Sequence, residues 1–242
     1  MLDTTTGAVV RQLALPEPTW AGAISPDGSL LALEAGDAVT QVGVVTGKQI
    51  TRTPLGDPDH HLYTEVTLDP TGRKLVVSSN DRFASLVEAT TGKLLGKLVS
   101  TRPITTSAFS PDGNWLLTWG EGNTVQLWDL RDRQVKGAVD RAAFEAFAFS
   151  ADGERFATGS EDGLVQIYDT RSVQLIARMQ VSRRTVTHVE FSADGTRLVV
   201  RTEAGIATLL DVALDRHSPA ELAALAAHHT RWKLRDGVLV QR

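Results

Sequence analysis

Phe149-Ser150-Ala151-Asp152-Gly153 is one of five similar short segments spread over most of the chain. The other four are Ile24-Ser25-Pro26-Asp27-Gly28, Leu68-Asp69-Pro70-Thr71-Gly72, Phe109-Ser110-Pro111-Asp112-Gly113 and Phe191-Ser192-Ala193-Asp194-Gly195. Their final glycines are 40 to 44 residues apart. A repeat of this length, built from short strands, is typical of the blades of a β-propeller. Because a single blade cannot bury both faces of its sheet, the repeats predict one continuous array rather than separate domains.

The repeat over residues 141–180 predicts four short antiparallel strands. Residues 144–150 alternate large and small side chains, and an Ala-Asp-Gly turn separates them from a second strand at 155–159. A third strand with alternating polarity is expected at 164–169 and a fourth at 173–179. Five such repeats predict an all-β propeller with five four-stranded blades.

Two segments of the expected third strands carry a family resemblance. They are Val125-Gln126-Leu127-Trp128-Asp129 and Val165-Gln166-Ile167-Tyr168-Asp169. Both resemble the strand ending that gives the WD40-repeat family its name, and the resemblance covers roughly residues 2–212. Thr46-Gly47-Lys48 and Thr91-Gly92-Lys93 are similar to the family's usual turn into the fourth strand. The resemblance implies a propeller that binds other proteins. The chain departs from the family because it lacks the usual Gly-His dipeptide before each first strand, which the family pairs with an Asp.

The two ends of the chain predict incomplete units. Residues 1–16 match the end of a third strand, a turn and a fourth strand, while the fifth repeat ends after its third strand at Asp211. In one interpretation residues 8–15 supply the missing outer strand of the fifth blade and close a five-bladed ring, which removes exposed sheet edges. In the other, the chain is part of a larger propeller. Residues 17–212 are expected to hold the five blades, and residues 213–242 a separate tail.

The tail predicts a short C-terminal helix followed by a hairpin. Ser218-Pro219-Ala220-Glu221 combines a capping residue, a proline at the first helical position and a glutamate three residues after the cap. The helix is expected to end near His229, and residues 232–240 form the hairpin. Packing of the helix against the last blade and docking to a neighbouring domain are the two alternatives.

Basic side chains recur at one position ahead of the first strand in four successive repeats. They lie ten or eleven residues before the turn aspartate or its equivalent, and they are His60, His61, Arg102, Arg141, Arg183 and Arg184. In a propeller this loop lies on one face, beside the mouth of the central channel. Because arginine offers a planar pair of donors to a carboxylate or phosphate, we expect a rim that binds an anionic partner.

Acidic residues in the turn between the second and third strands support a structural alternative. These pairs would link side chains within one blade: Arg102 with Glu121, Arg141 with Glu161, and Arg184 with Glu203. Such pairs would replace the family's His–Asp hydrogen bond. The two interpretations overlap, because the same arginines rim the expected binding face.

The sequence gives little support to an enzyme. It contains no cysteine, and its adjacent histidines at 60–61 and 228–229 would point to opposite sides of an extended chain. No H-E-x-x-H segment and no glycine-rich nucleotide loop occurs. His188, on an expected inner strand, is expected to be packed and hydrogen-bonded. We therefore expect no catalytic residue, metal or cofactor. A lactonase-like propeller hydrolase with a channel metal is the alternative, and a structural spacer is the third.

The overall charge bounds the class of partner. The 25 basic and 29 acidic residues give a net charge of −4, which lacks the basic footprint of a nucleic-acid-binding protein. No run of 18 apolar residues predicts a membrane span. The absence of cysteine and of a signal segment fits the cytoplasm, and the scarcity of lysine among the basic residues fits a bacterial genome. The leading hypothesis is a non-enzymatic protein–protein interaction scaffold that binds an acidic protein or peptide. It would be a monomer, or the regulatory or sensing portion of a larger bacterial signalling protein.

Overall fold

The computed structural model describes residues 6, 9, 19, 21–35, 38–55, 63–79, 82–120, 124–140, 144–213, 232–235 and 238–241. Within these ranges every regular element is a β-strand. No helix in the described ranges is long and apolar enough to cross a membrane.

The strands form antiparallel sheets in chain order. The first sheet consists of β1 (Ala21–Ile24), β2 (Leu30–Ala35), β3 (Ala38–Gly43) and β4 (Gln49–Pro54). The second consists of β5 (Tyr63–Leu68), β6 (Lys74–Ser79), β7 (Phe83–Glu88) and β8 (Leu94–Val99). The third consists of β9 (Thr106–Phe109), β10 (Trp115–Gly120), β11 (Thr124–Asp129) and β12 (Gln134–Asp140).

The remaining sheets are less uniform. The fourth consists of β13 (Phe144–Phe149), β14 (Arg155–Ser160), β15 (Leu164–Asp169) and β16 (Leu175–Gln180). The fifth has three strands among the described residues: β17 (Val186–Phe191), β18 (Arg197–Thr202) and β19 (Ala207–Asp211). A separate hairpin is formed by β20 (Trp232–Arg235) and β21 (Val238–Gln241).

The repeated Ser-x-Asp-Gly segments make the tight turn between the first and second strands. In the fourth sheet, Phe149 pairs with Phe156 at the end of the two strands, so residues 150–155 form the turn. Gly153 adopts a φ of 70°, in the left-handed region that glycine enters without steric cost. Its amide donates to the carbonyl of Ser150 at 2.8 Å. This local chemistry sets the register from which the rest of the sheet follows.

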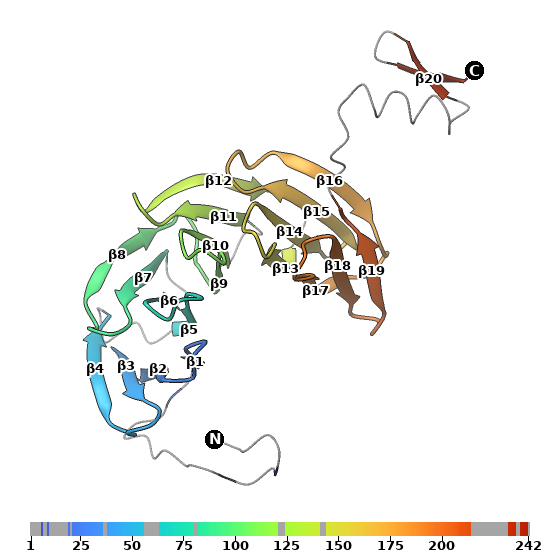
Figure 1. Ribbon diagram of the computed structural model, residues 1–242. Coiled ribbons are helices and arrows are strands. Elements are labelled where there is room, and N and C mark those ends of the chain that lie inside the picture. Colours follow the sequence, from blue (N-terminus) through green and yellow to red (C-terminus); the bar gives the residue numbers. More distant parts are fainter. Residues whose placement is uncertain are drawn as a thin grey trace.

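The five larger sheets lie side by side in an arc (Figure 1). Their first strands contact one another in sequence along its inner side, β1 with β5, β5 with β9, β9 with β13 and β13 with β17. The fourth strands β4, β8, β12 and β16 follow its outer side, and the first and fifth sheets stand at its two ends. This is the arrangement of propeller blades.

Apolar side chains between successive sheets hold the arc together. Four clusters occur in the described residues, one in each space between neighbouring sheets. Trp128 is 1% exposed and packs with Leu86 of the second sheet, and Phe156 of the fourth sheet packs with Leu127 of the third. The tryptophans at 115 and 119 also join the cluster between the third and fourth sheets. The faces that a single sheet could not bury alone are thus buried against the neighbouring sheet.

The all-β fold and the blade-like sheets are confirmed, and so is the hairpin predicted at residues 232–240. The predicted C-terminal helix lies outside the described residues. So does the segment 8–15 except for Val9. Closure of a five-bladed ring, membership in a larger propeller, and the division at residues 16 and 212 therefore stay predictions.

Candidate functional site

The arginines of the predicted rim that the structure describes lie in two equivalent loops. Arg102 precedes β9, and Arg183 with Arg184 precedes β17. All three side chains are exposed. Because β9 and β17 are both first strands, these loops lie at the same end of their sheets. We call the three residues the rim arginines. His60, His61 and Arg141 lie outside the described residues, and their place on the rim stays a prediction.

One of the three rim arginines faces a carboxylate of its own sheet. Nη1 of Arg184 lies 3.6 Å from Oε1 of Glu203, and the two side chains are 71% and 48% exposed. This confirms the intra-blade pair predicted for the fifth repeat. At this distance and exposure the pair contributes at most about 1 kcal/mol, so the guanidinium stays available to a partner.

The opposite end of the sheets carries the Ser-x-Asp turns. In each of four turns a serine hydroxyl donates to the aspartate two residues later, over 2.5 to 2.6 Å; the pairs are Ser25–Asp27, Ser110–Asp112, Ser150–Asp152 and Ser192–Asp194. The second repeat exchanges the two roles, because Asp69 occupies the serine position and accepts from the hydroxyl of Thr71 at 2.8 Å. These turns give one face of the arc a repeated set of ordered carboxylates.

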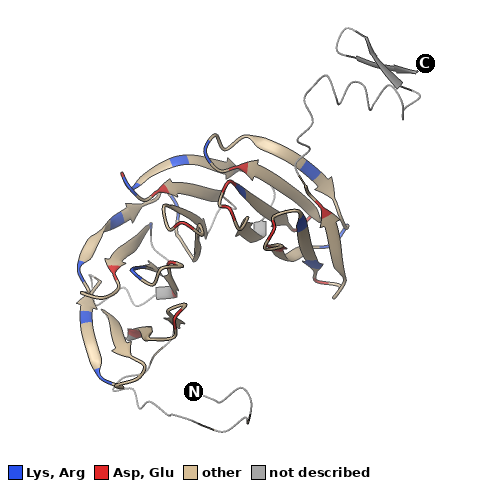
Figure 2. Ribbon diagram, in the orientation of Figure 1, with Lys and Arg blue, Asp and Glu red and all other residues tan. Residues whose placement is uncertain are grey.

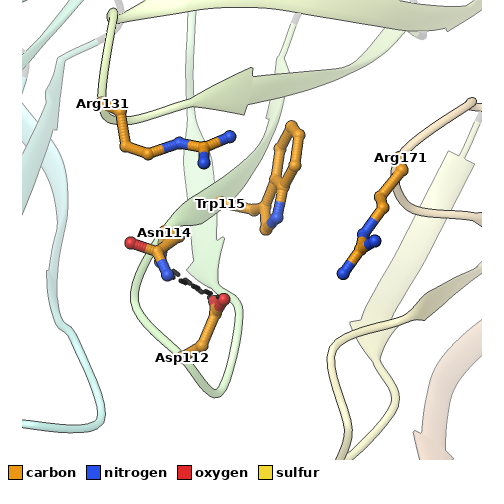
Figure 3. A pocket seen from close by; sticks show the side chains of 5 residues that line it. All are labelled: Asp112, Asn114, Trp115, Arg131 and Arg171. Atoms are coloured by element: carbon orange, nitrogen blue, oxygen red, sulfur yellow. Dashed lines mark hydrogen bonds between the residues drawn. The ribbon is translucent and has the colours of Figure 1, made fainter.

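A pocket opens on this face between the third and fourth sheets (Figure 3). It encloses about 560 Å³ and is lined by Asp112, Asn114, Trp115, Arg131 and Arg171. The indole of Trp115, half-buried against the inter-sheet core, lies between the two arginines in Figure 3. We call this the Trp115 pocket. Two sheets build it, because Arg171 comes from the turn between β15 and β16 and the other residues from the third sheet.

Hydrogen bonds fix most of the charges around this pocket. Arg131 donates through Nε and Nη2 to both carboxylate oxygens of Asp129, at 2.9 and 2.6 Å, which lowers the pKa of Asp129 and raises that of Arg131. The Arg131 guanidinium also lies 5.8 Å from the ring centre of Trp115. Burial raises the pKa of Asp112, but hydrogen bonds from Ser110 and Asn114 outweigh it and hold this pKa below its usual value. Both carboxylates are therefore ionised at neutral pH.

The comparison with known families agrees with this repeated architecture. The family model described as "WD domain, G-beta repeat" matches residues 92–129 and 141–169. The chain contains WD40 repeats. No curated protein matches it in sequence. WD40 repeats generally mediate protein–protein interaction, and proteins of this family are typically not enzymes.

Charge is unevenly placed on this WD40 array. Figure 2 shows a basic residue on each outer strand; these residues are Arg52, Lys97, Lys136 and Arg178. Acidic residues occupy many of the turns nearer the inner strands. Cations on outermost strands discourage edge-to-edge pairing with other sheets. The outer edges of the WD40 blades are thus protected, and the turn faces are left as the surfaces for recognition.

The described WD40 residues contain no group of three or more His, Cys, Asp or Glu side chains that could hold a metal ion. His188 lies on the inner strand β17, as predicted, and its Nε2 lies 3.3 Å from Oε2 of Glu190. Its side chain is 50% exposed, so the prediction that it is packed was wrong. The reason is that this face of the fifth sheet has no described sheet against it.

Sequence reasoning missed the Trp115 pocket, although a signal was present. The third strands of two neighbouring WD40 repeats end in Asp-x-Arg, as Asp129-Leu130-Arg131 and Asp169-Thr170-Arg171. The same spacing in adjacent blades places both arginines at equivalent turns on one face. The repeat therefore predicts a second basic position, on the face opposite the rim arginines.

Proposed function

We propose that this WD40-repeat protein is a non-enzymatic scaffold that binds an acidic segment of a partner protein through its rim arginines. The observation that carries the proposal is the recurrence of exposed guanidinium groups at equivalent loops of the third and fifth sheets. Among the described residues, the weak Arg184–Glu203 pair is the only ion pair that they make. Guanidinium groups bind carboxylates through paired, charge-assisted hydrogen bonds. A rigid array that presents them at fixed spacing favours an extended anionic partner.

The biological setting is proposed from the sequence. The absence of cysteine supports a cytoplasmic protein, and the low lysine content supports a bacterial origin. We propose that the array acts as the regulatory or sensing portion of a signalling protein. A rigid WD40 scaffold suits that role, because it can hold a partner without changing its own shape.

The test uses a fluorescein-labelled decapeptide of alternating glutamate and serine, with binding followed by fluorescence anisotropy. Affinity is expected to fall as salt rises, because exposed charges act through screened electrostatics. Alanine at all three rim arginines is expected to weaken binding by about tenfold or more.

A charge-matched control separates a specific rim from general attraction. Alanine at Lys48, Lys93 and Arg178 removes three exposed charges that lie away from the rim loops. This variant is expected to keep most of the affinity. Equal losses in the two triple variants, or no loss in either, would show that the rim arginines do not form the site.

A further inference from the structure

Arg171 enters the Trp115 pocket without an ion-pair partner among the described residues. Its counterpart Arg131 is held by the carboxylate at the end of its own third strand, Asp129. The carboxylate at the same place beside Arg171 is Asp169, whose Oδ1 accepts instead from the amide and hydroxyl of Ser172, at 2.8 and 2.7 Å. Ser172 therefore occupies one of the two carboxylate oxygens. Ser172, and less strongly Arg171, lower the pKa of Asp169, but no hydrogen bond joins the Arg171 and Asp169 side chains in the described structure, so the guanidinium can bind another acceptor.

The other free hydrogen-bonding groups of the pocket are mainly donors. In the described structure neither the indole N–H of Trp115 nor Nη1 of Arg131 has a hydrogen-bond acceptor. The carboxylate of Asp112 is already engaged in its own turn, by the hydroxyl of Ser110 at 2.5 Å and by the amide and side-chain nitrogens of Asn114 at 3.0 and 2.8 Å. The side-chain oxygen of Asn114 is the remaining free acceptor. A group that accepts several hydrogen bonds would complete the pocket.

A second pocket on the same face shows that these donors are not a general property of the repeat. It lies between the first and second sheets and encloses about 340 Å³. Aligned on the turns, Leu30 stands there at the position of Trp115, and Thr90 at the position of Arg171. That pocket has neither the aromatic wall nor the second guanidinium. The spacing of the sheets creates a hollow in both places. Arg73 is the one guanidinium among the residues lining the hollow between the first and second sheets, whereas two guanidinium groups and an indole line the Trp115 pocket.

The charge balance of the Trp115 pocket selects among anions. Arg131 and Arg171 carry two positive charges, and the carboxylates of Asp112, Asp129 and Asp169 beside them carry three negative charges. A singly charged carboxylate, held by directed hydrogen bonds, suits this balance better than a phosphate group that carries nearly two charges. The half-buried indole ring also offers an apolar surface for the methylene groups of a side chain.

We propose that the Trp115 pocket binds the side chain of a glutamate residue in a partner peptide. The carboxylate accepts hydrogen bonds from the guanidinium of Arg171 and from the indole N–H of Trp115, while the methylene groups lie on the indole ring. This site is on the face opposite the rim arginines and does not depend on them. It gives the scaffold a second contact with a specific residue preference.

The experiment follows the indole N–H of Trp115 by ¹H–¹⁵N NMR spectroscopy, with its signal assigned by comparison with Trp115→Phe. The probe is the capped tripeptide Ala-Glu-Ala, and the matched peptide Ala-Gln-Ala has the same shape without the charge. The glutamate peptide is expected to shift the signal saturably, with a dissociation constant on the order of 1 mM for so few contacts. The affinity for the glutamine peptide is expected to be lower by about tenfold or more.

Variants of the full chain test the assigned roles. Arg171→Gln is expected to weaken binding by about tenfold or more, and because this side chain is exposed the fold is retained. Ser172→Ala is also expected to weaken binding, since it frees Asp169 to pair with Arg171. Arg178→Gln is the matched control on β16 and is expected to bind like the parent. The triple-alanine variant at the rim arginines is expected to keep the Trp115 response, which separates this proposal from the proposed function.

Four results would overturn the proposal. They are an unmoved Trp115 signal, an equal response to the two peptides, an affinity of Arg171→Gln equal to that of the parent, and tighter binding of Ala-phosphoserine-Ala than of Ala-Glu-Ala. The last result would assign the pocket to a phosphopeptide instead.

Discussion

At the scale of single residues, the stability of the Ser-x-Asp turn depends on the ionisation of its aspartate. The hydroxyl of Ser192 donates to Oδ1 of Asp194 at 2.6 Å, and the amide and hydroxyl of Thr196 donate to the same oxygen at 3.0 and 2.9 Å. These bonds, with that of Ser192 the strongest, lower the pKa of Asp194 from 3.8 to about 2. A carboxylate that accepts hydrogen bonds in the folded state resists protonation, and the turn is most stable when it is ionised.

Replacement of Ser192 by alanine is expected to raise the pKa of Asp194 towards 3.8, because its strongest donor is lost. Since the folded pKa is the lower one, the stabilising effect is complete above about pH 4 and is lost as the pH falls through about 2. Titration of the carboxyl carbon by NMR measures the shift. Ser150→Ala, in the equivalent turn of the fourth sheet, serves as the control and should leave Asp194 unchanged. A pKa of Asp194 that stays near 2 in Ser192→Ala would contradict this assignment.

At the scale of elements, a basic residue at the start of the second strand links one sheet to the next. Nη2 and Nη1 of Arg155 donate to the carbonyls of Gly195 and Val212 in the fifth sheet, at 2.6 and 2.9 Å. Lys74 plays the same role between the second and third sheets, where its Nζ donates to the carbonyl of Gly113 at 3.0 Å. The turn glycine thus has two roles. Its conformation closes one hairpin, and its carbonyl accepts a hydrogen bond from a basic side chain of the preceding sheet.

Arg155 and Arg197 form a matched pair for measuring this link. Both begin the second strand of a sheet, but Arg155 is 5% exposed, whereas Arg197 is exposed and makes no side-chain hydrogen bond within the described part of the chain. Arg155→Ala is expected to destabilise the fold by about 2–4 kcal/mol, since it leaves one buried and one half-buried carbonyl without their charged donor. Arg197→Ala is expected to change stability by about 0.5 kcal/mol or less. Urea unfolding compares the two, and similar losses would argue against a link between the sheets.

The same scale shows how far the sequence predicts the elements. Strands and turns built on local chemistry were predictable, because the Asp-Gly turns fix where each hairpin closes. The fourth strand of the fourth sheet was expected from Val173 but begins at Leu175. Val173 adopts a φ of 57°, a conformation that β-branched residues rarely enter, so its side chain misled the prediction. Its counterparts Gly47 and Gly92, with φ values of 68° and 70°, marked this position as part of the turn.

The two candidate sites differ in how far the sequence predicts them. The rim arginines were predictable because a basic residue recurs in equivalent loops, at a fixed distance from a turn. The Trp115 pocket required knowledge of which turns meet across two sheets, since Trp115 and Arg171 are far apart in sequence. No local pattern carries that information. Arg171 also lacks the hydrogen bonds that Arg131 makes to Asp129, because Ser172 donates to the equivalent Asp169 instead.

At the scale of the whole molecule, the fifth sheet differs from the fourth because nothing described covers its far face. Residues along β18 alternate between exposed and buried, whereas every residue of β14 is buried. A Cβ atom on Gly159 would lie 2.3 Å from Cγ1 of Val186, so the fourth sheet needs a glycine where the fifth approaches. The fifth sheet has Arg201 at that position, exposed. Among the described residues, no sheet packs closely against this face of the fifth sheet.

Ile167 and Leu209 test this difference, because both stand two residues before the aspartate that ends a third strand. Ile167 is 2% exposed and packs against the fifth sheet, whereas Leu209 is 57% exposed. Ile167→Ala is expected to cost about 2–5 kcal/mol, through lost burial and the cavity left between the sheets. Leu209→Ala is expected to cost about 0.5 kcal/mol or less, as a surface substitution does. Thermal unfolding of the two variants measures the contrast. A loss at Leu209 as large as that at Ile167 would mean that the far face of the fifth sheet is covered in solution, and that the arc closes on a further sheet.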